Sequence, residues 1–277
     1  MNWSRVKWIL IGMLLLGNLA LALLYWQRGD GAGRAVDRFT NTMVTALADR
    51  GVSLAPEVEA KLSDSERRLY SPRDIAREED LAVSLLGRVS QIDQAGRIYR
   101  YETALGWARF RGGGQFEAEW SAPRAVEVSI WDDTLALLQQ AGFPTDPPPE
   151  IHNAPDGVTI TLRQYIGGFP VSESDAYVLL RYENDALVSL SGRWLLGAPL
   201  PADGEAPCPM LGAALLWFAD GQIDAGDPVS YIEDGQVFWR LSTFGSDYIC
   251  LTPAWRITAD GRNYDIDAET GMVITTS

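Results

Sequence analysis

Residues 176–194 read Ala-Tyr-Val-Leu-Leu-Arg-Tyr-Glu-Asn-Asp-Ala-Leu-Val-Ser-Leu-Ser-Gly-Arg-Trp. Apolar and polar side chains alternate on both sides of Asn184-Asp185, a dipeptide that suits the tight turn of a hairpin. The pattern therefore predicts two antiparallel strands, over 176–182 and 186–194. Each strand would turn one face toward a core and the other toward water.

Working outward from this hairpin, the sequence repeats the same two kinds of pattern. Strands are expected at 98–110, 115–120, 158–165, 229–232, 236–241, 248–257 and 264–266, with turns at 112–114, 234–235 and 260–261, and helices at 35–50, 78–86, 131–142 and 210–218. Single helices among hairpinned strands predict an α+β fold, with helices packed on one face of antiparallel sheets. A helix followed by strands occurs in 131–194 and again in 210–275, which indicates an internal duplication.

The chain has 277 residues, of which 47% are hydrophobic. This is enough for one large domain or two modest ones with real cores. A proline-rich stretch from Pro144 to Pro155 is the best candidate for a boundary. The predicted organisation is a cytoplasmic stub and membrane anchor in 1–27, a first α+β domain in 35–143 and a second in 156–277.

The anchor is predicted from residues 6–26, a mostly apolar run with no acidic side chain. A helix of this length crosses a hydrocarbon core of roughly 30 Å. Trp8 lies near one end and Tyr25 and Trp26 at the other, where aromatic residues favour the membrane interfaces. The basic residues near the start favour a cytoplasmic N-terminus. We expect a single transmembrane helix followed by two extracytoplasmic domains in a cell-membrane protein.

A cleaved signal peptide is the alternative, with Ala20-Leu21-Ala22 as the small-residue cleavage site. The long run and its bulky aromatic end favour an uncleaved anchor, and both alternatives export the rest of the chain. Asn18 lies within the span, where an amide gains about 1 kcal/mol from a partner on another helix. Asn18 therefore either contacts another membrane protein or bonds its own backbone, and the sequence leaves both open.

Charge and reactive residues restrict the function further. The chain carries 23 basic and 37 acidic residues, a net charge of −14. Such a surface favours solubility and repels phosphate backbones, so no nucleic-acid partner is expected. The one histidine, His152, lies in a stretch with the composition of a loop.

No Ser–His–Asp set, phosphate-binding loop or zinc motif can be placed. We expect no enzyme, no cofactor and no metal site, with a carboxylate-only glycosidase as the remaining catalytic alternative. The two cysteines, Cys208 and Cys250, would close a loop of about 40 residues if they form a disulfide in an exported protein. The alternative is a pair of buried thiols.

Three blocks of sequence indicate a family. They are Asn2-Trp3-Ser4-Arg5-Val6-Lys7 before the apolar run that contains Asn18, then 165–171 (Tyr-Ile-Gly-Gly-Phe-Pro-Val) with Gly-Arg-Trp at 192–194, and finally 253–257 (Pro-Ala-Trp-Arg-Ile) with 264–273 (Tyr-Asp-Ile-Asp-Ala-Glu-Thr-Gly-Met-Val). In this order they resemble the YycI family. YycI and its YycH relatives are single-pass accessory proteins that regulate the WalK (YycG) sensor histidine kinase of Gram-positive bacteria. The resemblance implies a sensor histidine kinase and a YycH-like protein as partners.

The last block is also similar to the closing strand of PepSY-type modules. We expect Asp267 to accept hydrogen bonds from the turn that follows it, and Gly271 to take a positive φ. A calcium site made by Asp265, Asp267 and Glu269 is the alternative, although the other ligands of such a site are missing. Three functions are therefore expected in descending order: a non-catalytic kinase regulator, a PepSY-like module that binds peptide or wall material, and a wall hydrolase.

Overall fold

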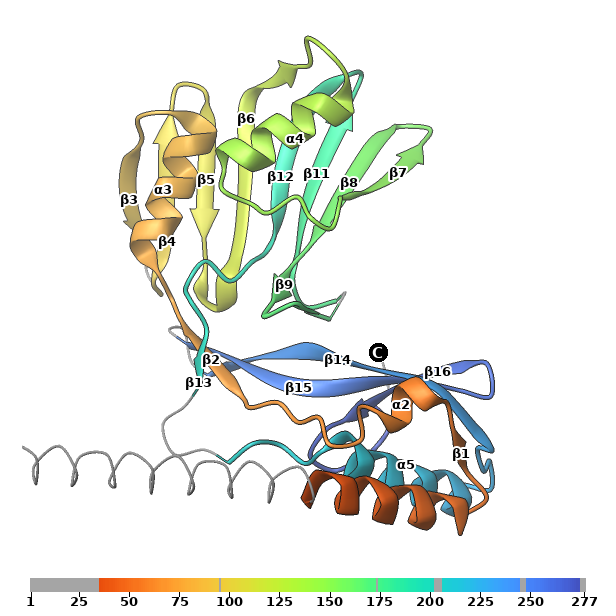
Figure 1. Cartoon of the computed structure of the whole chain (residues 1–277). Helices are drawn as coiled ribbons and strands as arrows, with labels where there is room; N and C mark the ends of the chain where they lie inside the picture. Colours follow the sequence, from red (N-terminus) through yellow and green to blue (C-terminus); the bar gives the residue numbers. More distant parts are fainter. Residues whose placement is uncertain (1–34, 95, 173, 202–205, 245–247, 275–277) are drawn as a thin grey trace, which may run out of the picture. The chain divides into compact units, whose positions relative to one another are not determined.

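The computed structural model describes residues 35–94, 96–172, 174–201, 206–244 and 248–274. Over these residues the fold is α+β, as the sequence predicts, and the chain divides into two compact units (Figure 1). The predicted membrane segment, residues 6–26, lies outside the described residues. Within the described ranges, none of the helices combines the length and the apolar character needed to cross a membrane.

The two units are not consecutive in sequence. The first takes Met1–Asp64, Met210–Gly235 and Ile257–Ser277, and the second takes Ser65–Pro209 and Gln236–Arg256. The expected boundary at Pro144–Pro155 therefore falls inside the second unit, after its second helix, and includes a strand at Glu150–Ala154. Proline ends regular structure locally, but here the strands after it hydrogen-bond into the sheet that began before it.

The second unit is built on an eight-stranded antiparallel sheet. In spatial order its strands are β3 (Ser90–Gln94), β4 (Ile98–Thr103), β5 (Gly106–Phe110), β6 (Gln115–Ala125), β12 (Ala186–Arg193), β11 (Tyr177–Glu183), β8 (Gly157–Arg163) and β7 (Glu150–Ala154). The sequence-predicted strand 98–110 is itself a hairpin, β4 and β5. Two short strands, β9 (Tyr165–Ile166) and β10 (Phe169–Pro170), form a separate ribbon between β8 and β11.

The sheet consists of two halves with the same plan. Each half has one helix followed by four strands of the sheet, and the last strand of each half lies at the centre. There β6 pairs with β12 over Phe116↔Gly192 and Ala118↔Leu190. The order of a helix before strands recurs in the first unit at 211–267. The duplication expected from the sequence relates 131–194 to 210–275. It does not include residues 75–125, where the same order of a helix before strands occurs.

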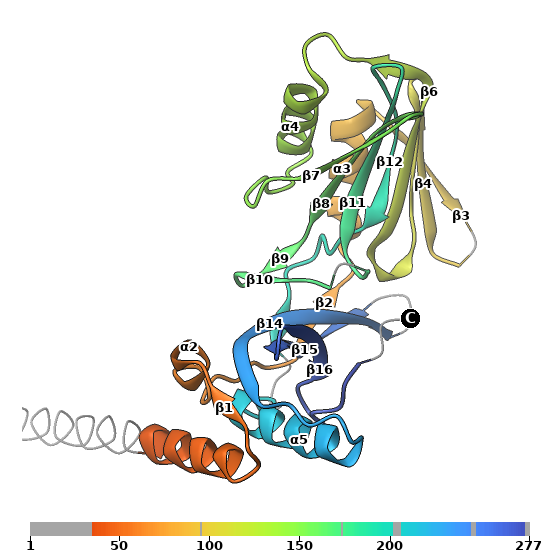
Figure 2. The ribbon, with the colours of Figure 1, turned by 90° about the vertical axis from the view of Figure 1, so that its right-hand side faces the viewer.

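Two helices cover one face of this sheet, α3 (Ile75–Leu86) and α4 (Ile130–Gln140) (Figures 1 and 2). Each begins at a side-chain cap: Asp74 accepts a hydrogen bond from Arg77 N, and Ser129 accepts one from Asp132 N. Their apolar stripes pack on the inward residues of the strands, which are buried at every second position, as in β5. The other face of the sheet keeps its polar side chains.

Aromatic rings run through the core between helices and sheet. Phe110 stacks on Phe116 with ring centroids 6.1 Å apart, Phe116 stacks on Phe143 at 6.2 Å, and Trp194 meets Phe143 edge-on at 5.1 Å. Burying each of these rings stabilises the fold by about 1.5–3 kcal/mol. The row joins β5, β6, the end of α4 and the end of β12, so it holds both halves of the sheet to the same core.

The first unit packs two helices side by side, one over residues 35–48 and the other α5 (Leu211–Asp224) (Figures 1 and 2). Its remaining elements are β1 (Ser53–Leu54), α2 (Pro56–Glu59), β16 (Arg262–Asp267) and parts of β14 (Tyr231–Phe244) and β15 (Tyr248–Ala259). The rest of β14 and β15 belongs to the second unit, with β2 (Leu69–Pro72) and β13 (Leu200–Pro201). Arg50 pairs with Asp220 and fixes the first helix to α5.

The predicted turn at Asp234-Gly235 is wrong, because β14 runs through it without a break. The Asp234 carboxylate accepts a hydrogen bond from the Gly235 amide at 2.8 Å, and Lys61 Nζ donates to Gly235 O at 3.0 Å. Leu211 and Ile257 lie against Gly235. Contacts with Lys61, Leu211 and Ile257 therefore override the turn that the local sequence favours.

Two buried tyrosines of the second unit provide a test of this core. The hydroxyl of Tyr182 lies 2.8 Å from Thr134 Oγ1 and donates to Asp133 Oδ2 at 3.2 Å, whereas the Tyr101 hydroxyl has no hydrogen-bond partner. Burial raises the pKa of both phenols to about 12. Tyr182→Phe should therefore lower the free energy of unfolding by about 1–2 kcal/mol, and Tyr101→Phe should leave it unchanged or raise it. Urea unfolding of both variants checks this, and equal losses would contradict it.

Candidate functional site

The face of the eight-stranded sheet away from α3 and α4 carries polar side chains in rows set by strand register. One row runs Arg109↔Glu117↔Ser191 across β5, β6 and β12. The next runs Gln115↔Arg193↔Tyr177 across β6, β12 and β11. Side chains opposite one another on neighbouring strands lie close enough to act on the same ligand.

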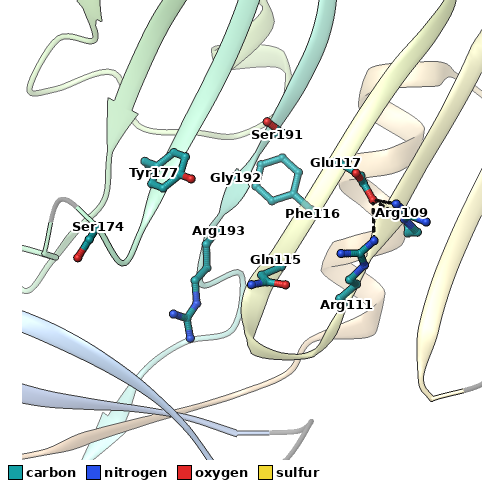
Figure 3. Close-up of a pocket in the computed structure, with 10 residues that line it drawn as sticks. All are labelled: Arg109, Arg111, Gln115, Phe116, Glu117, Ser174, Tyr177, Ser191, Gly192 and Arg193. Carbon is teal, nitrogen blue, oxygen red and sulfur yellow. Dashed lines mark hydrogen bonds and ion pairs between the residues drawn. The ribbon is translucent and has the colours of Figure 1, made fainter. Parts of the chain in front are cut away.

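A hollow of about 300 Å³ lies over these rows (Figure 3). Its lining residues are Arg109, Arg111, Gln115, Phe116, Glu117, Ser174, Tyr177, Ser191, Gly192 and Arg193. Most belong to the two central strands and the strands that flank them, and Ser174 comes from the segment before β11. Figure 3 shows Gln115 between the guanidinium groups of Arg193 and Arg111. The site is therefore assembled from both halves of the sheet.

The lining is positively charged, since it holds three arginines against one glutamate. Glu117 serves two of them: Arg109 pairs with Glu117 Oε1, and Arg111 Nη2 lies 3.3 Å from the same oxygen. On its other side Arg109 lies over the Trp107 ring, 5.4 Å from its centroid, and Arg100 lies over that ring at 4.7 Å. Arg109 is thus held in place by an ion pair and a ring contact.

Arg193 is held differently. Its Nε donates a hydrogen bond of 2.7 Å to the carbonyl of Gly113, in the turn between β5 and β6. In the described part of the chain no residue accepts a hydrogen bond from its two Nη groups, and no carboxylate forms an ion pair with it. Burial lowers the pKa of Arg193, and the nearby charge of Asp175 acts in the opposite direction. The guanidinium stays charged at neutral pH, because the ordinary pKa of arginine lies far above 7.

Gly192 lets the backbone bring Arg193 to this position. A Cβ at residue 192 would lie 2.0 Å from Tyr177 O on the neighbouring strand β11. No side chain fits at that distance, so only glycine allows β12 and β11 to pair here while Arg193 extends over the open face.

The structure places the sequence-predicted site residues elsewhere. Asn18 lies outside the described residues. Cys208 and Cys250 are both buried and are not joined by a disulfide. Cys208 N donates to Glu66 O, whereas Cys250 is paired with Tyr70 in the strand register, so the two cysteines lie beside positions four residues apart on the same segment.

His152 also differs from expectation, because it lies on β7 and not in a loop. It is exposed, with its Nε2 3.8 Å from Glu150 Oε2. β7 is an edge strand of the sheet. The proline-rich sequence before it concealed the strand pattern, so the composition of this stretch indicated a loop.

The predicted turn after β16 is confirmed. Asp267 Oδ1 accepts hydrogen bonds from Glu269 N at 2.9 Å and Thr270 N at 3.1 Å, and Gly271 has φ of +67°. These contacts occupy the carboxylate that the calcium alternative requires. Throughout the described ranges, no cluster of three side chains suited to a metal is found.

Sequence reasoning missed the arginines of the hollow. A partial signal existed, because Arg109 and Glu117 lie on the polar faces of strands joined by a predicted turn at 112–114. They line the same hollow as Arg193 only because β6 (Gln115–Ala125) pairs with β12 (Ala186–Arg193), and these two strands are far apart in sequence. Nothing local to either strand specifies that pairing.

Comparison with known proteins identifies no family. No protein-family model matches the chain, and no curated protein does. Two solved structures are similar at low level. One is an uncharacterised protein from Eubacterium rectale, with 10% identity, a TM-score of 0.42, and coverage of 77% of this chain and 86% of that one. The other is the YpeB C-terminal domain from Bacillus megaterium, with 10% identity, a TM-score of 0.37, and coverage of 74% and 96%. The resemblance to the YycI family therefore stays a prediction.

Gly192 supplies the prediction for this site. Gly192→Ala should lower the free energy of unfolding by about 2 kcal/mol or more, because the added methyl meets backbone that must move. Gly221→Ala is the matched control: a Cβ there meets nothing within 4 Å, and alanine favours the helix by about 1 kcal/mol. Urea unfolding should show opposite signs for the two variants. A stable Gly192→Ala protein would contradict the strand geometry.

Proposed function

We propose that this chain is a non-catalytic binding module that holds a polar ligand against the open face of its eight-stranded sheet. The hollow over the two central strands carries the proposal, because its lining offers hydrogen-bond donors with no partner in the described protein. The Nη groups of Arg193 are the clearest of these donors. A pre-formed hollow with a few converging polar groups is the usual form of a small-ligand site.

The chemistry of the lining supports binding more than catalysis. Within the described ranges, neither of its two serines has a basic side chain as hydrogen-bond partner; Ser174 Oγ lies 3.2 Å from Ser172 Oγ. A serine nucleophile needs such a base. Glu117 is engaged by two arginines. A carboxylate in that position orients charge and is poorly placed to exchange protons with a substrate.

The proposed ligand is a short peptide or a fragment of cell-wall material, met outside the membrane to which residues 6–26 would anchor the chain. A volume of about 300 Å³ is at the lower end for small-molecule sites, which suits a ligand of a few residues. The sheet continues on both sides of the hollow, through β4 and β8, so the rest of a longer ligand would lie along the same face.

Soluble peptidoglycan fragments test this function on the full-length chain in detergent. Binding should raise the melting temperature with increasing fragment concentration, since the ligand stabilises only the folded state. Ser191→Trp fills the hollow and should abolish the increase. Thr159→Trp is the matched control, because Thr159 lies on the open face of β8 but does not line the hollow.

Two results would contradict the proposal. One is a wild-type melting temperature that does not respond to the fragments or to a set of short peptides. The other is an equal response in Ser191→Trp, which would place the ligand elsewhere. An intact response in Thr159→Trp shows that a tryptophan on this face is tolerated.

A second candidate function is accessory regulation of a sensor histidine kinase, as the resemblance to YycI implies. The apolar run at 6–26 with Asn18 inside it favours this function, because a polar side chain in lipid gains from a partner helix. Such a regulator shifts a kinase between states only by binding one state better.

Co-purification from membranes tests this second function. The kinase should be enriched with the wild-type chain, and Asn18→Leu should reduce that enrichment severalfold, because one interhelical hydrogen bond is worth about 1 kcal/mol. Leu14→Ile, a change within the same apolar run, should not. Equal enrichment in all three chains would remove Asn18 from the contact, and no enrichment of a kinase would remove the function.

A further inference from the structure

The unused donors of Arg193 define what kind of ligand group would fit the hollow. A guanidinium has five N–H donors in a planar fork. Arg193 uses one of them, Nε, on the Gly113 carbonyl at 2.7 Å. That bond orients the planar guanidinium through Nε and leaves the two Nη groups available at the hollow (Figure 3). A fork held in this way matches two oxygens of a carboxylate or phosphate.

Among the described residues, no carboxylate forms an ion pair with Arg193. The charge of Asp175 favours the charged form of Arg193, but Asp175 forms no ion pair with it, and its Oδ2 accepts a hydrogen bond from Leu241 N at 3.0 Å. Glu117 is held by Arg109 and Arg111 on the other side of Gln115. A half-buried cation without an ion-pair partner costs free energy, and an anionic ligand would offset that cost.

The surroundings favour an anion and disfavour a cation. Three arginines and one glutamate line the hollow, although the whole chain has a net charge of −14. Tyr177 and Gln115 flank Arg193 in the strand register and add neutral donors. The positive charge of the lining is therefore local, and it is opposite in sign to the net charge of the chain.

We infer that Arg193 is the recognition residue for an oxyanion group, a carboxylate or a phosphate, on the ligand that occupies this hollow. The inference rests on the proposed binding function and specifies its ligand. Arg193 would bind the oxyanion through its Nη groups, with Gln115 and Tyr177 beside it. Arg109 and Arg111 would add positive potential that Glu117 reduces.

Calorimetric titration of the full-length chain tests the inference with three probes: inorganic phosphate, acetyl-dialanine with a free C-terminal carboxylate, and the same peptide as its amide. We expect an anionic probe to bind and the amide to bind at least tenfold more weakly. Arg193→Gln should weaken anion binding at least tenfold. Arg181→Gln is the matched control, because Arg181 is an exposed arginine on the same sheet and pairs with Glu183 outside the hollow.

Glu117→Gln provides a test of opposite sign. Removing the only carboxylate of the lining should strengthen anion binding severalfold, because Arg109 and Arg111 lose their internal partner. This variant keeps the inference testable if Arg193→Gln does not fold, which its melting curve would show. Unchanged or weaker binding in Glu117→Gln would count against the inference.

The outcomes separate the two levels of the proposal. Binding of phosphate alone assigns a phosphate-bearing ligand, and binding of the acid peptide alone assigns a carboxylate; both support the inference. It is overturned if Arg193→Gln binds the anions as the wild type does, or if neither anion binds while peptidoglycan fragments still raise the melting temperature. If peptidoglycan fragments still raise the melting temperature, the proposed binding function stands without the inference. If the fragments have no effect either, both are overturned.

Discussion

The antiparallel pairing of β6 with β12 is the interaction on which the second unit depends. It joins two halves that each place a helix before four strands, and it gives both a single core. Without it each half would present an open central edge, and short sheets with open edges are marginally stable and prone to pair with other chains. The aromatic row from Phe110 through Phe116 and Phe143 to Trp194 secures the same junction from the helix side.

The same pairing connects the core to the candidate site. Because side chains alternate across a strand, the register that turns Phe116 into the core also turns Gln115 and Glu117 outward. On β12, the register that buries Leu190 leaves Ser191 and Arg193 on the open face. A slip of one residue would exchange the two sets. Burial of the aromatic and aliphatic residues therefore fixes the geometry of the hollow, and the polar residues that line it need contribute little to stability.

Electrostatics act at two scales in this protein. The excess of acidic residues sets the field that a distant partner meets, and salt screens it beyond about 8–10 Å. Within the hollow, the three arginines and Glu117 decide the local sign. Arg109 lies over the Trp107 ring and pairs with Glu117, Arg111 pairs with the same glutamate, and Arg193 donates a hydrogen bond to the Gly113 carbonyl. A binding surface of one sign can thus exist on a protein of the other, provided that its charges are positioned by packing and not by composition.

The sequence by itself determined the α+β class, most helices and hairpins, and the Asp267–Gly271 turn, because each depends on periodicity or turn chemistry within a few residues. It misplaced the domain boundary at Pro144–Pro155 and the turn at Asp234-Gly235, because packing by distant elements overrode local signals. Only the tertiary structure decided that Arg109 and Glu117 meet Arg193. The physical reason is that the β6–β12 register is selected by burying both strands against a shared core, and no single segment encodes that choice.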